Sequence, residues 1–175
     1  MQDNLQNNFT LKSLTSILIG GFILILSYSL KTILNKYLFT DNDSLIIFGF
    51  IFTLILLSTL ILFFDGKRTT KKNHTTLWNT ETKLATKKYL ISFTVIISVL
   101  TALLNLEFLE YLTPTFLILY GGLLFLFKKN ERKNLLVLSG LCLLLAVMCF
   151  LIPSYWYSSL SIIGIAHIAY GVVTK

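Results

Sequence analysis

Charged residues are scarce in this sequence, and that scarcity excludes an ordinary soluble domain. Only 13% of the 175 residues are Asp, Glu, Lys or Arg, whereas 55% are hydrophobic and the mean hydropathy is +0.77. Soluble domains carry about 25% charged residues, because their surfaces face water. The composition therefore predicts an all-α polytopic membrane protein, with residues 1–175 forming a single transmembrane domain.

Cysteines are few, and the usual catalytic motifs are absent. Cys142 and Cys149 lie seven residues apart, which separates them by roughly 10 Å along a helix and prevents a disulfide between them. The sequence has no phosphate-binding glycine loop, no Gly-x-Ser-x-Gly, no His-Glu-x-x-His and no Cys-x-x-Cys. We therefore expect a protein that is not an enzyme and that holds no metal or cofactor.

Long apolar runs predict about six membrane-spanning helices, because a helix needs roughly 20 apolar residues to cross the hydrocarbon core. The predicted spans cover residues of about 14–38, 45–64, 89–106, 113–127, 135–152 and 158–173. Pro153 and the aromatic residues after it end the fifth span and are typical of a membrane interface. The connections are short, with one exception.

That exception is the polar segment of residues 65–88. Its threonine-rich first half predicts a loop, and the stretch from Leu77 to Leu90 predicts a short helix lying in the membrane interface. Seven basic residues lie in this segment: Lys67, Arg68, Lys71, Lys72, Lys83, Lys87 and Lys88. We expect them to form a basic contact surface.

The distribution of basic residues predicts the orientation of the bundle. Eleven of the fifteen lysines and arginines lie in residues 65–88 and 128–134. Because basic connections stay on the cytoplasmic side, both connections and both termini are predicted to be cytoplasmic. Glu107 and Glu110 then lie on the outer side, three apart on one helix face, as interfacial carboxylates that could pair with Lys31 or Lys36. The net charge of +7 suits anionic lipid headgroups, and we expect no direct binding of nucleic acid.

His167 is the ionisable residue placed most clearly inside a predicted span, and such residues are candidates for functional sites. Gly164, His167, Ile168 and Gly171 share one helix face, where the glycines favour a close neighbouring helix. His167 is interpreted either as a ligand-binding or proton-responsive group, with Tyr120, or as a neutral histidine bonded to a hydroxyl on another helix. Three hydroxyls are candidates for that bond: Tyr28, Tyr120 and Thr53.

Two glycine pairs suggest that the chain could contain an inverted repeat of three helices. Gly20-Gly21 and Gly121-Gly122 occupy corresponding positions if the chain consists of two inverted sets of three helices. Inverted repeats build many transporters, in which weakened helices lie near the binding site. Close packing of helices is the alternative explanation of the same residues.

The C-terminal half resembles a group of small uncharacterised bacterial six-helix membrane proteins. The resemblance covers roughly residues 112–173 and lacks one tryptophan of the group's pattern, which falls between the proline and the first tyrosine. The matching residues are Pro114, Tyr120-Gly121, Gly164, His167-Ile168 and Tyr170-Gly171. Members of that group accompany small winged-helix transcription regulators, so the resemblance implies a sensing or sequestering role in the bacterial inner membrane.

These observations favour a non-enzymatic membrane bundle that senses a signal or binds a protein partner through residues 67–88. The alternative is a small solute or ion transporter, or its membrane-embedded substrate-binding subunit, with a site near the middle of the membrane.

Overall fold

Six α-helices make up almost all of the computed structural model, which describes residues 11–36, 43–73, 78, 80–126 and 133–174. Two short 3-10 turns, η1 (Leu109–Tyr111) and η2 (Pro153–Tyr155), precede the fourth and sixth helices. The α-helices are α1 (Ser13–Lys36), α2 (Asp43–Asn73), α3 (Thr80–Asn105), α4 (Leu112–Leu126), α5 (Lys133–Leu151) and α6 (Trp156–Val173). The predicted all-α fold is confirmed.

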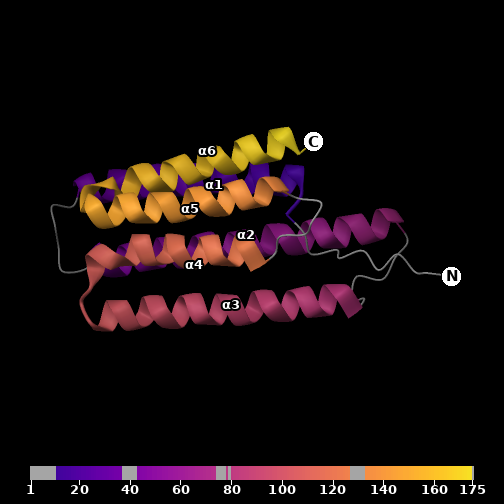
Figure 1. Ribbon diagram of the computed structural model, residues 1–175, viewed down its shortest axis with the longest axis horizontal. Helices are drawn as coiled ribbons and strands as arrows, with labels where there is room; N and C mark the ends of the chain where they lie inside the picture. The colour runs from indigo at the N-terminus through magenta and orange to yellow at the C-terminus, as the bar shows by residue number, and fades with distance from the viewer. Residues whose placement is uncertain (1–10, 37–42, 74–77, 79, 127–132, 175) are drawn as a thin grey trace.

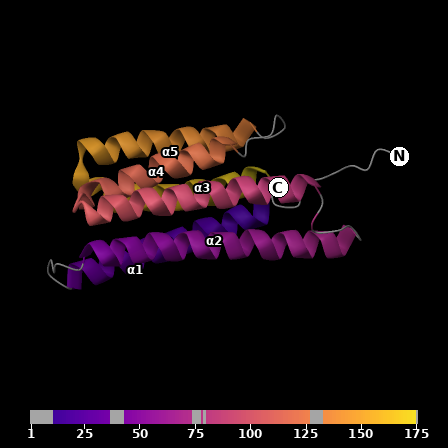
Figure 2. The same ribbon diagram turned by 90° about the horizontal axis from the view of Figure 1, so that it is seen from below.

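The helices lie roughly parallel and antiparallel in one bundle (Figures 1 and 2). The most extensive contacts join α1 to α6 and α4 to α5, while α2 packs on α1 and α3 packs on α4. Contacts between α5 and α6 connect the two groups. Because α6 packs against α1, contacts between the first and last helices close the bundle.

Five of these helices are long and apolar enough to cross a membrane, and α5 contributes a shorter apolar helix, Leu135–Leu151, within the described part of the chain. Large apolar side chains are exposed along the outer faces, including Phe52, Leu56 and Leu60 on α2. In water such faces would be unfavourable, whereas in a bilayer they meet acyl chains. The protein is therefore a multi-pass membrane protein.

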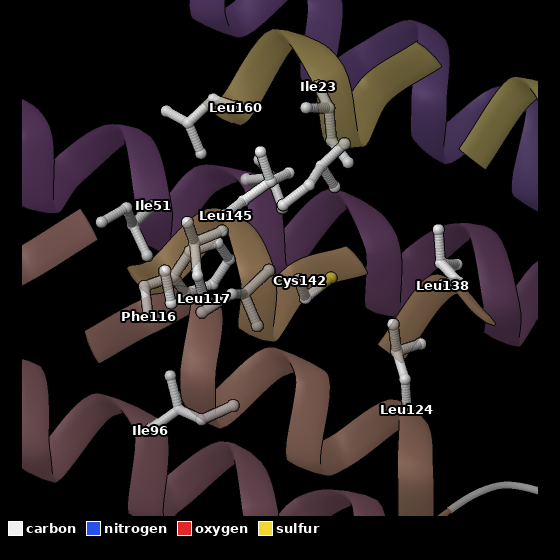
Figure 3. Packing of buried hydrophobic residues seen from close by; sticks show 14 of the residues in the cluster. Ile23, Ile51, Ile96, Phe116, Leu117, Leu124, Leu138, Cys142, Leu145 and Leu160 are labelled. Carbon is white, nitrogen blue, oxygen red and sulfur yellow. The ribbon is translucent and has the colours of Figure 1, made fainter. Parts of the chain in front are cut away.

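A core of aliphatic and aromatic side chains fills the centre of the bundle (Figure 3). Leu117 and Phe116 of α4 meet Cys142 and Leu145 of α5 there, and all four are buried. Cys142 and Cys149 are both buried free thiols, as the sequence predicts. Cys149 contacts the hydroxyl of Ser159, with 3.0 Å between Sγ and Oγ.

Glycines allow α1 and α6 to approach almost to backbone contact. A Cβ atom on Gly20 would lie 2.5 Å from the carbonyl oxygen of Gly164, and one on Gly171 would lie 2.5 Å from that of Ser13. Both distances are too short for any side chain. The hydroxyl of Ser13 donates a hydrogen bond to the carbonyl of Gly171 across the same interface. Gly164, His167 and Gly171 are buried, which confirms their predicted inward face.

The two glycine pairs do not occupy equivalent environments. Gly20 packs against α6, whereas Gly121 packs against the backbone of Ser139 on α5. An inverted repeat would place these two glycines against corresponding helices, and α6 and α5 do not correspond in that scheme. A Cβ atom on Gly21 or Gly122 would meet nothing within 4 Å. Helix packing by one member of each pair therefore explains the glycines.

The polar segment differs from the prediction, because most of its described part is helical. Helix α2 continues to Asn73, and α3 begins at Thr80 and runs unbroken into its apolar part. The expected loop before residue 74 and the separate interfacial helix from Leu77 to Leu90 are therefore wrong. Threonines are tolerated here because their hydroxyls bond within the helix, as Thr70 does with the carbonyl of Lys67 at 2.9 Å.

The end of α3 also differs from the prediction. Asn105 is its last residue, and Glu107 follows with a φ of 59°. The amide of Phe108 donates to the carbonyl of Leu103 at 3.0 Å, and that of Glu107 donates to Leu104 at 3.1 Å. This pair of bonds forms a Schellman cap, in which glycine usually occupies the left-handed position. Glu107 and Glu110 consequently do not share a helix face, because Glu110 lies in η1.

Candidate functional site

His167 lies at the centre of a buried hydrogen-bond network that joins three helices. It has no exposed surface. Its Nε2 lies 2.6 Å from the hydroxyl of Tyr120 on α4, and its Nδ1 lies 3.1 Å from the hydroxyl of Ser16 on α1. Of the three hydroxyls considered from the sequence, the structure brings Tyr120 to His167. Tyr28 is exposed, and Thr53 donates to Gly49 of its own helix.

The bonds of Ser16 determine which ring nitrogen carries the proton. The Ser16 hydroxyl donates its hydrogen to the main-chain carbonyl of His167 at 2.8 Å. Its oxygen can then only accept from Nδ1–H, which leaves Nε2 as the acceptor for the Tyr120 hydroxyl. Every polar atom of the three side chains is satisfied in this arrangement with a neutral imidazole. The network, here called the His167 network, therefore links α1, α4 and α6 without a buried charge.

The His167 network lies near one end of the bundle. Ser16 is three residues after the start of α1, and His167 and Tyr120 each lie six residues before the end of their helices. At 1.5 Å per residue these positions are about 4.5–9 Å from the helix ends. Ser16 could not be identified as a site residue from the sequence, because its role depends on the packing of α1 against α6.

Helices α2 and α3 extend beyond the other four at this same end (Figures 1 and 2). The 31 residues of α2 span about 46 Å, and the 26 of α3 about 39 Å, against a hydrocarbon core of about 30 Å. Six of the predicted basic residues are exposed on the last part of α2 and the first part of α3: Lys67, Arg68, Lys71, Lys83, Lys87 and Lys88. These six are called the basic surface below. The side chain of Lys72 lies outside the described residues.

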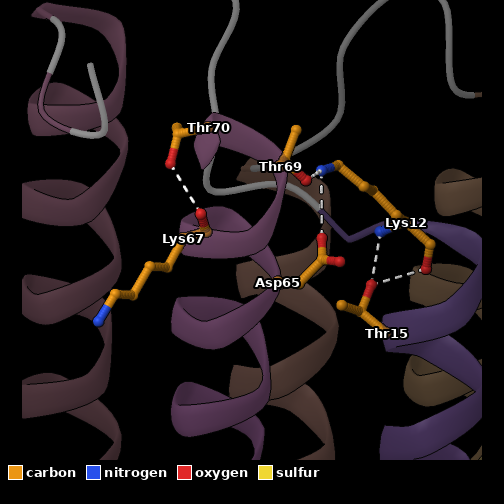
Figure 4. Close-up of polar contacts among 6 residues, drawn as sticks. All are labelled: Lys12, Thr15, Asp65, Lys67, Thr69 and Thr70. Atoms are coloured by element: carbon orange, nitrogen blue, oxygen red, sulfur yellow. Dashed lines mark hydrogen bonds and ion pairs between the residues drawn. The ribbon is translucent and has the colours of Figure 1, made fainter. Parts of the chain in front are cut away.

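A cluster of polar contacts ties the start of α1 to the α2 extension (Figure 4). The ammonium group of Lys12 lies 3.1 Å from a carboxylate oxygen of Asp65 and donates a hydrogen bond to the hydroxyl of Thr69. Asp65 is largely buried. Lys12 thereby offsets the acidic charge that lies closest to the basic residues of α2, and it fixes α2 to the helix that carries Ser16.

The remaining predicted residues lie at the other end of the bundle. Glu107 and Glu110 are exposed. The ammonium group of Lys31 lies over the ring of Tyr157, 4.4 Å from its centroid. No ion pair joins Lys31 to either glutamate among the residues that the structure describes, and the side chain of Lys36 is not among them.

No protein family, curated protein or solved structure matches this chain. The resemblance of its C-terminal half to small bacterial six-helix membrane proteins stays a prediction. The candidate sites consequently depend on geometry alone. The start of α1 lies between them: Lys12, just before α1, contacts Asp65 and Thr69 of α2, and Ser16 of α1 contacts His167.

Proposed function

We propose that this chain is a non-enzymatic membrane bundle that holds an acidic partner at the membrane surface through its basic surface. The observation that carries the proposal is the exposure of six basic side chains on the last part of α2 and the first part of α3, the two helices that extend beyond the other four at this end. A helical scaffold fixes these charges in place, so binding loses less conformational entropy than it would on a loop. Charge complementarity then favours acidic partners.

We also propose an orientation of the bundle in the membrane. If all six helices cross, α1 begins and α6 ends on the same side as the basic surface, as Figure 1 illustrates for the bundle. The positive-inside rule makes that side cytoplasmic in a bacterial inner membrane. A cytoplasmic basic surface would be accessible to soluble regulators as well as to the inner leaflet.

In this proposal the His167 network has a structural role. Its polar atoms are mutually satisfied, so the network holds α1, α4 and α6 together behind the surface that α1 anchors through Lys12. A small solute or ion transporter remains the second candidate function, because three helices converge on buried polar groups there. Uptake of a solute that is lost in His167→Phe, with the fold retained, would favour transport.

Purification in mild detergent from native membranes tests the proposal. Wild type is compared with a variant in which all six residues of the basic surface are changed to glutamine, after labelling has verified an unchanged orientation. We expect a stoichiometric acidic component, identified by mass spectrometry, to be retained by wild type and lost from the variant. Identical components in both preparations would contradict the proposal.

A further inference from the structure

Four members of the basic surface lie directly above lipid-facing apolar residues. On α2, Lys67 and Arg68 follow Phe64 by three and four residues, and Phe64 is 61% exposed. On α3, Lys87 and Lys88 precede Ile91 by four and three residues, and Ile91 is 56% exposed. Residues three and four apart share a helix face, so each apolar residue is flanked by two cations on the same face.

Each of these four cations lies about one helical turn nearer the end of the bundle than an exposed apolar residue of its own helix. Their Cα atoms lie about 4.5–6 Å along the axis from Phe64 or Ile91, at 1.5 Å per residue. The headgroup layer occupies about 5–8 Å outside the hydrocarbon core on each side of a bilayer. Lys71 and Lys83 lie farther from the apolar parts and would meet water first.

The two pairs of cations belong to neighbouring helices. The hydroxyl of Thr59 on α2 lies 2.6 Å from that of Tyr89 on α3, next to Lys88 in the chain, and this contact holds the two helices side by side. Thr59 precedes Lys67 by eight residues, so the Cα atoms of the α2 pair lie roughly 10 Å farther along the bundle than those of the α3 pair. The carboxylate of Asp65 is turned toward Lys12, and Figure 4 shows Lys67 extending away from that pair. Lys12 therefore reduces the repulsion that Asp65 would exert on an anion at Lys67 and Arg68.

We propose that Lys67, Arg68, Lys87 and Lys88 form a binding site for an anionic phospholipid. Its phosphate lies between the α2 pair and the α3 pair, within reach of their long side chains, while its acyl chains lie along the exposed face that includes Phe64 and Ile91. This inference rests on the proposed function, because it names the acidic partner as a lipid of the same leaflet rather than a soluble protein. Charge complementarity at headgroup depth favours the lipid.

The test uses the full chain reconstituted in phosphatidylcholine bilayers with spin-labelled phosphatidylglycerol or spin-labelled phosphatidylcholine as the probe. Electron paramagnetic resonance gives the relative association of each probe with the protein. We expect wild type to prefer phosphatidylglycerol, and the variant K67Q/R68Q/K87Q/K88Q to lose at least about tenfold of that preference, since each basic group near an anionic surface is worth about fivefold.

Two controls separate a site from general attraction. The variant K67R/K87R/K88R keeps the charges and should keep the preference. The variant K128Q/K129Q/R132Q/K133Q removes three charges from the connection between α4 and α5 and one from the first residue of α5, and it should also keep the preference. The inference is overturned if wild type shows no preference, if the glutamine variant keeps it, or if the second control loses as much.

The result also distinguishes this inference from the proposed function. A soluble acidic protein could copurify with wild type and be lost from the six-residue glutamine variant, while wild type shows no preference for phosphatidylglycerol. In that case the lipid site is wrong and the proposed function stands. If neither a protein nor a lipid depends on these residues, both are wrong.

Discussion

Replacing Gly20 with alanine should destabilise the packing of α1 against α6. The new Cβ atom would lie 2.5 Å from the carbonyl oxygen of Gly164 and 2.9 Å from the amide nitrogen of Ile168. Both neighbours belong to the α6 backbone, so they can move only if the helices separate by several tenths of an ångström. That separation would also lengthen the bond between Ser16 and His167.

Gly21 supplies the matched control for this change. A Cβ atom there meets nothing within 4 Å, so Gly21→Ala adds the same atom to the same helix without a clash. The gain in helix propensity, about 1 kcal/mol, applies to both variants and cancels in their comparison. The difference between them is then the cost of overpacking, about 1–3 kcal/mol. Gly20→Ala should be less stable than Gly21→Ala by that amount.

Reversible unfolding in mixed micelles, followed by circular dichroism, measures the free energy of unfolding of both variants. We expect a lower midpoint for Gly20→Ala and a midpoint at or above that of wild type for Gly21→Ala. If the two variants unfold with equal free energies, α1 and α6 do not approach as closely as described here. The conclusion that glycines allow α1 and α6 to pack almost at backbone contact would then be refuted.

Three further changes are measured in the same assay. Tyr120→Phe leaves Nε2 of His167 buried without its donor and should cost about 1–3 kcal/mol, whereas no loss would mean that the bond is not formed. Glu107→Gly relieves the left-handed conformation at the end of α3 and should stabilise the protein by about 1 kcal/mol; destabilisation would contradict the cap. Asp65→Asn removes the charge of a partly exposed ion pair with Lys12 and should cost about 1 kcal/mol or less, so a larger loss would contradict the partial exposure of that pair.

The membrane character and the helices of this protein could be predicted from hydropathy alone. Apolar runs determine where helices enter lipid, because backbone groups there must be satisfied within the helix. The ends of the helices were less predictable. The α2 extension carries charges and threonines that are typical of loops, and its helix is continuous with an apolar span. Glu107 occupies a cap position at which glycine is the usual signal.

The candidate site could be predicted only in part. The glycines around His167 indicated a close helix neighbour, and Tyr120 was one of three possible partners. Ser16 and the pair of Lys12 with Asp65 could not be found, because residues more than 50 positions apart meet only through the order of the helices around the bundle. The basic residues were evident, but their exposure on two rigid helices depended on where those helices end.

Photocrosslinking from the basic surface in living cells tests the central claim most directly. A photoreactive amino acid replaces Lys71 or Lys83, both exposed on the extensions, and Phe108 at the other end of the bundle serves as the control. We predict a defined acidic adduct, protein or lipid, from the first two positions and not from the third. Absence of adducts at Lys71 and Lys83, or the same adducts from all three positions, would contradict the assignment of the basic surface as a contact site.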